Sequence, residues 1–460
     1  MSFSGLTIKK GDLLELVIES LASGGQGLAR LNSLVIFVRD ALPGDKVKAK
    51  IVKTKSSFAE AELIDLIQAS PDRVTPRCSH FGTCGGCQWQ NLDYLRQLEY
   101  KTLQVKEALE HIAGFAASPL LPALPAQEIY FYRNKMEFSF SSDLEGRLIL
   151  GLHLAGRFDQ VFDLEACFLQ SEISNQIVQR VKTFCREKRL SVYDLKSYTG
   201  LLRFLVIKQA HNSGEVMVNI VTQAGDASEL KILAEKLVKE FPMVKSMVRN
   251  INTKKAQIAI GEKEEVLAGR SFIVERIGAF QFQISANSFF QSNSSQAEKL
   301  YSLATRFAQP GPQDTVLDLY SGTGTISFFL AQKAGRILGI ESNPQTVEDA
   351  QKNARLNRIE NCHFICSEAK DYLALALLRK EEFNAVLVDP PRSGLHPQVI
   401  ENLIRLSPPK IIYVSCNPAT LARDMKMLCE SAYSLEKIQP LDMFPHTYHI
   451  ETVSQLLRKT

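Results

Sequence analysis

The stretch Thr315-Val-Leu-Asp-Leu-Tyr-Ser-Gly-Thr-Gly-Thr325 decides the fold of the C-terminal half of the chain. Its first residues form a short apolar run that is typical of a buried strand, and the glycine-bearing turn after it predicts the start of a helix. Gly322 and Gly324 lack a Cβ atom, so a ligand can approach the backbone of this turn closely. The stretch therefore predicts a strand, a ligand-binding turn and a helix in succession.

Four more apolar runs follow downstream, with helical stretches between them. They are RILGIE (336–341), CHFICS (362–367), AVLVDP (385–390) and IIYVSC (411–416). Strands that alternate with helices in this way predict a parallel, doubly wound α/β sheet of the Rossmann type. Ligands of such sheets bind beyond the carboxyl ends of the strands, so the residues that end these runs are the candidate site residues.

An acidic residue at the end of the second strand indicates the cofactor. Glu341 follows the glycine turn by about 20 residues, where a carboxylate can accept hydrogen bonds from two hydroxyls of a ribose. The turn lacks the third glycine of a dinucleotide fingerprint, and this D-L-x-x-G-x-G turn is typical of S-adenosylmethionine enzymes; NAD is the alternative. We expect Asp389 to face the same crevice from the end of its own strand.

A cysteine ends the last of these apolar runs, beside the same predicted cleft. Cys416 could be a small core residue, but its place also suits a nucleophile. A thiolate that adds to carbon 6 of uracil makes carbon 5 able to attack a methyl sulfonium. A base must then remove the proton from carbon 5, and a late segment of the chain offers His446, His449 and Glu451.

Motifs in four places give the chain a specific resemblance to one family. They are Phe289-Phe-Gln291, Asp389-Pro-Pro-Arg392, Ser415-Cys-Asn-Pro-Ala-Thr-Leu-Ala-Arg-Asp424 and the segment from Asp442 to Glu451. Together they resemble the RNA uracil-5-methyltransferase family, and most closely its ribosomal RNA branch, which has an N-terminal TRAM domain and a [4Fe-4S] cluster. The resemblance covers nearly the whole chain.

The resemblance implies a role for each matching residue. Cys416 would be the nucleophile, and Glu451 would be the base that removes the carbon 5 proton. The residues that would line the S-adenosylmethionine site are Gln291, Tyr320, Glu341 and Asp389. Many relatives have a cysteine where this chain has Ser321, and we expect little effect because the cofactor approaches the backbone there.

The remaining cysteines suggest a metal site. Cys78, Cys84 and Cys87 lie in a glycine-rich loop, and Cys167 lies far downstream. Four thiolates suit zinc as well as a [4Fe-4S] cluster, and the spacing leaves that choice open. The family resemblance favours the cluster, with Cys167 as fourth ligand and Cys185 as the alternative. Four cysteines would close the coordination of the cluster, so we expect a structural or RNA-docking role for it.

The other cysteines and the aromatic residues that flank this loop have simpler expectations. Cys362, Cys366 and Cys429 are predicted to be core cysteines. Phe81 and Trp89 flank the cysteine loop, where they would either stack on RNA bases or shield the cluster from solvent. The residues alone do not separate these two possibilities.

The first part of the chain has a different pattern. Residues 12–67 contain about five short β-like runs separated by Gly- and Pro-bearing turns, which predicts a small OB-like β-barrel that could hold an oligonucleotide. Within it Lys46, Lys48 and Lys50 alternate, so they should share one face of a strand. A solvated strand face and a stripe for the RNA backbone are both open.

We therefore expect three domains. They are an OB-like TRAM domain over 1–67, a central α+β domain with the cysteine loop over 68–272, and a Rossmann-like methyltransferase domain over 273–460. A helix over about 92–113 would pack on the catalytic domain.

Composition sets the remaining expectations. With 45% hydrophobic and 23% charged residues and a net charge of +4, the chain resembles an ordinary globular protein. No apolar stretch reaches the roughly 20 residues that span a bilayer, and the N-terminus has no secretory signal. We expect a cytoplasmic monomer that does not bind membranes and whose partner is RNA, with 23S rRNA favoured and tRNA as the alternative.

Two other functions remain open. A cytosine-5 methyltransferase uses the same thiolate addition, but its nucleophile lies in a Pro-Cys context, whereas Cys416 precedes Asn417 and Pro418. A non-catalytic RNA-binding module of ribosome assembly would use only the N-terminal domain and the cysteine loop. In that case Cys416 would have no chemical role.

Overall fold

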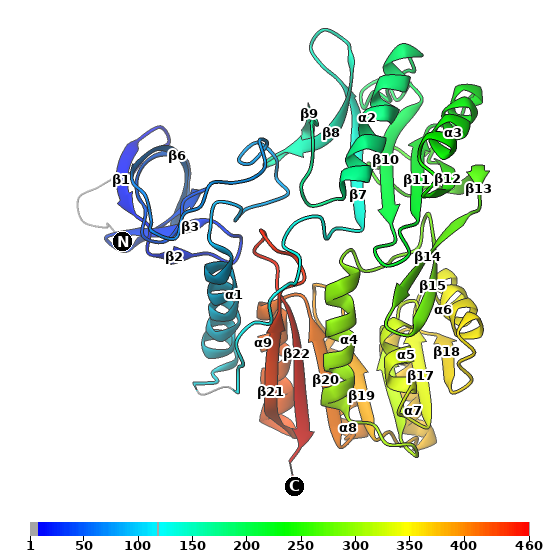
Figure 1. The fold of residues 1–460 in the computed structure, drawn as a ribbon. Coiled ribbons are helices and arrows are strands. Elements are labelled where there is room, and N and C mark those ends of the chain that lie inside the picture. The colour runs from blue at the N-terminus through cyan, green and yellow to red at the C-terminus, as the bar shows by residue number, and fades with distance from the viewer. Residues whose placement is uncertain (1–7, 117–118, 460) are drawn as a thin grey trace.

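The computed structural model describes residues 8–116 and 119–459. The described strands form three large sheets and one two-stranded hairpin (Figure 1). The N-terminal sheet lies beside the long first helix, and the central sheet lies above the catalytic sheet in this view.

The N-terminal sheet has six strands in the order β1-β5-β6-β4-β3-β2. Its strands are β1 (Leu13–Val17), β2 (Ser20–Leu21), β3 (Gly27–Leu31), β4 (Leu34–Arg39), β5 (Lys46–Thr54) and β6 (Phe58–Gln68). The sheet curls strongly (Figure 1), but in the described part of the chain no ladder joins the edge strands β1 and β2. The predicted strands are present, although the barrel is not closed by hydrogen bonds.

The lysines of β5 share one face, as their alternation predicts. Val47, Ala49 and Ile51 are buried, and Lys48 and Lys50 between them are exposed. Acidic residues lie opposite on both neighbouring strands: Lys48 pairs with Glu15 on β1 and Asp65 on β6, and Lys50 pairs with Glu62. Lys46 Nζ also lies 3.2 Å from Glu15 Oε2. These carboxylates offset the positive charge of the stripe, which favours the solvated-face interpretation.

A long helix connects the N-terminal sheet to the rest of the chain. Helix α1 (Tyr94–Ala108) begins at Asp93, whose side chain accepts hydrogen bonds from the backbone of Leu95 and Arg96, and continues as a π-helix, η1 (Leu109–Ala113). The apolar side of both packs in one core with α9 (Pro418–Ser431), and this core includes Val105, Leu109 and Leu421. This helix thus joins the catalytic part of the chain.

The central sheet has seven strands in the order β13-β12-β11-β10-β7-β8-β9. They are β7 (Lys135–Ser142), β8 (Leu148–Leu154), β9 (Arg157–Asp163), β10 (Leu202–Gln209), β11 (Val216–Thr222), β12 (Val244–Ile251) and β13 (Lys263–Gly269). Helices α2 (Glu172–Glu187) and α3 (Ser228–Glu240) share one core with this sheet. A hairpin of β14 (Phe272–Ile277) and β15 (Phe280–Ser285) leads into the catalytic sheet.

The catalytic sheet has seven strands in the order β18-β17-β16-β19-β20-β22-β21. They are β16 (Thr315–Leu319), β17 (Arg336–Glu341), β18 (Cys362–Cys366), β19 (Ala385–Val388), β20 (Lys410–Ser415), β21 (Tyr433–Leu441) and β22 (Glu451–Arg458). One core holds α4 (Ser294–Ala308), α5 (Thr325–Ala331) and α6 (Pro344–Leu356). The core of the opposite face holds α7 (Ala369–Arg379), α8 (Pro397–Leu406) and α9.

The predicted doubly wound sheet is confirmed, and it has an antiparallel edge that the alternation of strands and helices did not predict. The strands β16 to β20 are parallel, but β22 runs antiparallel to both β20 and β21. The alternation of strand and helix stops after α9, and a chain that returns without a crossover helix can only pair antiparallel.

Among the described residues, no helix combines the length and the hydropathy that a membrane-spanning segment requires.

Candidate active site

The antiparallel edge brings Cys416 and Glu451 together. Ser415 at the end of β20 pairs with Thr452 on β22, so the next pair in this register is Cys416 and Glu451. Both residues thus lie at the carboxyl end of β20, where the Rossmann-type sheet binds its ligands. Residues from distant parts of the sequence become neighbours because of the strand that the sequence pattern did not predict.

Asp389 belongs to the same group. It follows β19, which lies beside β20, and its backbone N–H donates to Leu319 O over 3.3 Å. Burial raises the pKa of Asp389 to about 7. Burial, and next the charge of Asp389, raises the pKa of Glu451 to about 8. The two carboxyl groups therefore lie close enough to interact.

Both neighbouring carboxylates raise the pKa of the Cys416 thiol. Burial, then Glu451 and then Asp389 raise its pKa to about 11, and the charge of Arg392 acts in the opposite direction. Arg392 also lowers the pKa of Glu451. A positively charged ligand in this crevice would favour the ionised forms of all three acidic groups, because it would offset their mutual repulsion.

The glycine turn after β16 has one open position and one filled position. A Cβ atom on Gly322 would meet no atom within 4 Å, so this residue leaves room for a ligand. A Cβ atom on Gly324 would lie 2.6 Å from Phe364 Cζ, so this glycine serves the packing of the turn and not the approach of a ligand. The expectation that both glycines admit a ligand is therefore wrong for Gly324.

Glu341 and Tyr320 border the open position. Glu341 Oε2 accepts a hydrogen bond from Gly322 N over 3.3 Å, and its Oε1 accepts one from Asn343 N over 2.8 Å. Tyr320 has a φ of 65°, which turns the chain from β16 into the glycine turn. Asp318, which the sequence reasoning did not single out, is buried beneath them with a pKa raised by desolvation to about 7. Its position in the D-L-x-x-G-x-G turn is the sequence signal that could have identified it as a site residue.

A cavity of about 480 Å³ opens beside Cys416. One wall comes from the catalytic part of the chain, with Cys416, Arg392, Tyr448 and His449. The opposite wall comes from α1 and η1, together with Ser23 of the N-terminal sheet region; its polar members are Gln104, Glu107 and His111. Sequence reasoning did not place α1 at the nucleophile, and the amphipathic pattern of the helix carries no signal for it.

Gln291 lies in a different cavity from Cys416. It follows the exposed Phe289 in the loop after β15, and it lines a space of about 630 Å³ together with Phe290, Phe444 and the cysteine loop. Of the predicted cofactor residues, Tyr320, Glu341 and Asp389 thus gather at the ends of β16, β17 and β19. Gln291 approaches from the side of the cysteines.

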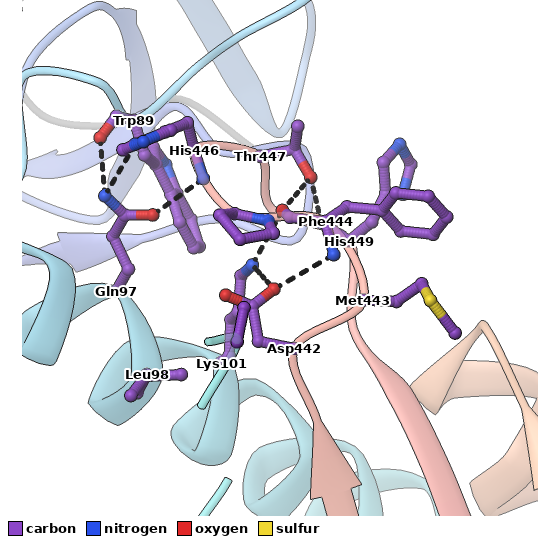
Figure 2. A network of polar contacts seen from close by, with 12 residues as sticks. Trp89, Gln97, Leu98, Lys101, Asp442, Met443, Phe444, His446, Thr447 and His449 are labelled. Atoms are coloured by element: carbon purple, nitrogen blue, oxygen red, sulfur yellow. Dashed lines mark hydrogen bonds and ion pairs between the residues drawn. The ribbon is translucent and has the colours of Figure 1, made fainter. Parts of the chain in front are cut away.

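The segment before β22 is held by a buried polar network (Figure 2). Lys101 of α1 donates from Nζ to Asp442 Oδ1 over 2.6 Å and to Phe444 O over 3.1 Å, and both charged side chains are completely buried. Tyr94 donates its hydroxyl to Asp442 Oδ2 over 3.0 Å. The start of the segment that ends at Glu451 is therefore anchored to α1.

His446 is a structural residue of this network. Its backbone N–H donates to Gln97 Oε1 over 2.9 Å, and its carbonyl accepts from Gln88 N and Trp89 N over 2.9 and 3.0 Å. Burial lowers the pKa of its ring to about 4. Burial, and next Arg392, also lowers the pKa of His449 to about 4, so both imidazoles are neutral at pH 7.

Four of the cysteines line one cavity. Cys78, Cys84, Cys87 and Cys167 all border the space of about 630 Å³. Burial raises the pKa of Cys84 to about 11 and that of Cys87 to about 12, and the other thiols add to the shift. Within residues 8–116 and 119–459, no three His, Cys, Asp or Glu side chains form a group that could hold a metal ion. Cys185 lies elsewhere, fully buried in the core of the central sheet.

One of the two open interpretations of Trp89 is excluded, and the predicted core position is wrong for one cysteine. Trp89 is fully buried and its indole N–H donates to Gly25 O over 3.0 Å, so it cannot stack on an RNA base. Cys366 is exposed and not a core residue, because it ends β18 at the edge of the sheet. Cys362 is buried, Cys429 is half-buried, and Phe81 lines the cysteine cavity.

A Rossmann-like sheet with an open glycine turn, an acid on the next strand and further acids beyond it defines an S-adenosylmethionine-dependent methyltransferase. Comparison with known proteins gives the family. Residues 93–459 match the family described as tRNA (Uracil-5-)-methyltransferase, and residues 9–64 match the TRAM domain. The chain belongs to this family of RNA methyltransferases.

Relatives match along almost the whole chain. An uncharacterized RNA methyltransferase of Halalkalibacterium halodurans is 38% identical, with 99% of each chain covered. One of Chlorobaculum tepidum is 39% identical, with 97% of this chain and 96% of the other covered. The crystal structure of Pyrococcus abyssi tRNA (uracil-54, C5)-methyltransferase with S-adenosyl-L-homocysteine covers 96% of this chain and 100% of its own, at 31% identity and a TM-score of 0.78.

The coupling between Cys416 and its charged neighbours predicts how the thiol titrates. Glu451→Gln should lower the pKa of Cys416, because it removes the carboxylate whose charge raises that pKa more than the charge of Asp389 does. Arg392→Gln should raise the pKa of Cys416, because it removes the opposing positive charge. The pH dependence of iodoacetamide labelling, followed on the Cys416 peptide by mass spectrometry, measures both shifts. Identical pH profiles of labelling for the two variants and for the protein without substitutions would contradict the described geometry.

Proposed function

We propose that this protein methylates carbon 5 of a specific uridine in RNA, with S-adenosylmethionine as methyl donor, Cys416 as nucleophile and Glu451 as base. The pairing of β20 with β22 carries the proposal, because it puts a thiol and a half-buried carboxyl at neighbouring positions of the ligand-binding edge. Membership of the uracil-5-methyltransferase family supports the choice of base and of ring position.

S-adenosylmethionine supplies an electrophilic methyl group on a sulfonium when it is bound. The thiolate of Cys416 forms a bond to carbon 6 of the uracil, and the electron pair of the C5–C6 double bond becomes available at carbon 5. Carbon 5 takes the methyl group as the sulfonium–methyl bond breaks, and the electron pair of that bond stays on the sulfur of the departing thioether. Glu451 then accepts the proton from carbon 5. The C5–C6 double bond re-forms as the bond between Cys416 and carbon 6 breaks, which releases 5-methyluridine and the thiolate.

The residues around the turn fit this cofactor. The space at Gly322 admits a ligand next to the backbone, and Glu341 has its carboxylate at that turn, where it would accept from the ribose hydroxyls. Asp389, Tyr320 and Gln291 would complete the site. The raised pKa values of Asp389 and Glu451 suit a cationic donor, whose positive charge would favour the carboxylate form that Glu451 needs as a base.

We also infer a [4Fe-4S] cluster on Cys78, Cys84, Cys87 and Cys167, whose thiols line one cavity. Four thiolates suit zinc as well as a [4Fe-4S] cluster, and the family resemblance favours the cluster. We expect iron and acid-labile sulfide in protein purified without oxygen, lost in Cys167→Ser but kept in Cys185→Ser; zinc alone would contradict the cluster.

The RNA substrate is the finer part of the proposal. A TRAM domain together with the four-cysteine loop favours 23S rRNA, as in the branch of the family that the sequence resembles. tRNA is the alternative, and the solved relative from Pyrococcus abyssi, a tRNA (uracil-54, C5)-methyltransferase, supports it.

Transfer of labelled methyl from S-adenosylmethionine to unmodified 23S rRNA and unmodified tRNA tests the reaction and the substrate together. We expect 5-methyluridine at one or more positions of the rRNA, and none with Cys416→Ala. The matched control is Cys429→Ala, a half-buried cysteine on α9 away from the cavity, which should keep its activity. Label in tRNA alone would move the substrate to tRNA, and label in neither RNA would favour a non-catalytic RNA-binding protein.

Glu451→Gln separates addition from release. An amide cannot accept the carbon 5 proton, so the thiol adduct should form, take the methyl group and then persist. We expect an RNA-protein adduct that survives denaturing gel electrophoresis and disappears in the double variant with Cys416→Ala. Normal turnover by Glu451→Gln would show that another group is the base.

A further inference from the structure

An exposed arginine, Arg77, lies beside the cysteine loop. Arg77 immediately precedes Cys78. Nearby Arg73 lies 2.7 Å from Asp45 Oδ2, and Arg96 lies 3.0 Å from Asp72 Oδ1. In the ranges that the structure describes, Arg77 forms no such ion pair.

Aromatic rings hold this arginine instead. The guanidinium carbon of Arg77 lies 5.3, 4.8 and 4.7 Å from the ring centroids of Tyr130, Phe131 and Phe168. These rings come from two separate segments, of which the second adjoins Cys167. Cation–π contacts with three rings fix the position of a side chain that would otherwise be mobile in solvent.

Phe131, one of the three residues whose rings contact Arg77, has an unusual backbone conformation. Phe131 has a φ of 57°, a left-handed conformation that is rare and strained for a bulky residue. Its N–H donates to Phe168 O over 2.8 Å, and the two ring centroids are 6.1 Å apart. The structure thus holds the two phenylalanine rings together under Arg77 against a conformational cost.

A stacked guanidinium of this kind is suited to an anion. The guanidinium contacts the three rings and Arg77 is still exposed, so its N–H groups can donate to a ligand from solvent. Such a fork matches the oxygens of a phosphate, and its low mobility reduces the entropy lost on binding. By contrast, the lysines of β5 already face carboxylates on β1 and β6.

The position relative to the active site indicates which anion. The ring of Tyr130 also lies 4.4 Å from the ring of His446, in the segment that leads to Glu451. The residues that follow the cysteine loop, Gln88 and Trp89, hydrogen-bond to the carbonyl of His446. Arg77 therefore lies one aromatic ring away from the catalytic segment.

We propose that Arg77, held by Tyr130, Phe131 and Phe168, binds a backbone phosphate of the substrate RNA close to the target uridine. The inference rests on the proposed function for its choice of RNA. It makes the rim of the cysteine loop, and not the lysine face of β5, the main contact for the RNA backbone. Phosphate contacts fix the register of a nucleic acid without reading its sequence.

Binding of a labelled single-stranded, uridine-containing oligoribonucleotide to the full-length protein tests the proposal. Arg77→Gln should weaken binding about tenfold, as expected for a lost charge-assisted contact. It should also reduce the slope of log K against log salt by about 0.7, the share of one phosphate on a single strand. Arg77→Lys keeps the charge without the fork, and it should keep the slope but recover only part of the affinity.

A matched control lies near the opposite end of β10. Lys255 is exposed and lies 4.3 Å from the ring centroid of Tyr198, near the start of β10, whereas Arg77 lies near its end. Lys255→Gln should therefore leave affinity and slope unchanged. If Arg77→Gln matches the unmodified protein in both quantities, or Lys255→Gln weakens binding equally, the proposal is wrong. Because the assay contains no methyl transfer, RNA that is bound but never methylated would count against the proposed function alone.

Discussion

The ion pair between Lys101 and Asp442 is the interaction on which the active site depends. Both side chains are completely buried, and burial lowers the pKa of Lys101 while Asp442 opposes that shift. Removing one partner of such a pair typically costs about 3–5 kcal/mol, because the remaining charge stays in a low-dielectric interior. The pair is stable here because Tyr94 and the backbone of Phe444 complete the hydrogen bonds of the carboxylate.

The same network connects the parts of the chain that would hold RNA with the part that would carry out the chemistry. The indole of Trp89 donates to Gly25 in the N-terminal sheet region, and the backbone of Trp89 donates to His446 in the catalytic segment. Gly25 allows this approach, since a Cβ atom there would lie 3.2 Å from both Gln88 Cβ and Tyr448 Cδ1. A shift in the cysteine loop would therefore reach the segment that ends at Glu451.

Sequence reasoning found the chemistry of this site more readily than its architecture. The residues at the strand ends could be identified as candidate site residues because a parallel sheet places them at one edge, whatever lies between them in the sequence. The sequence alone did not give the role of Gly324, because only the neighbouring Phe364 shows that the turn is packed there. The burial of Trp89 and the exposure of Cys366 depend on contacts with Gly25 and on the order of the strands, neither of which has a local sequence signal.

By itself the sequence determined the Rossmann-like half, the family, the cofactor class and a short set of candidate site residues, because these depend on local periodicity and on motifs of fixed spacing. Only the tertiary structure decided that Cys416 and Glu451 are neighbours, because their contact follows from the antiparallel return of β22. It also decided that α1 forms a wall of the cavity at Cys416. Long-range pairing and burial depend on the whole chain at once, so no single stretch of sequence encodes them.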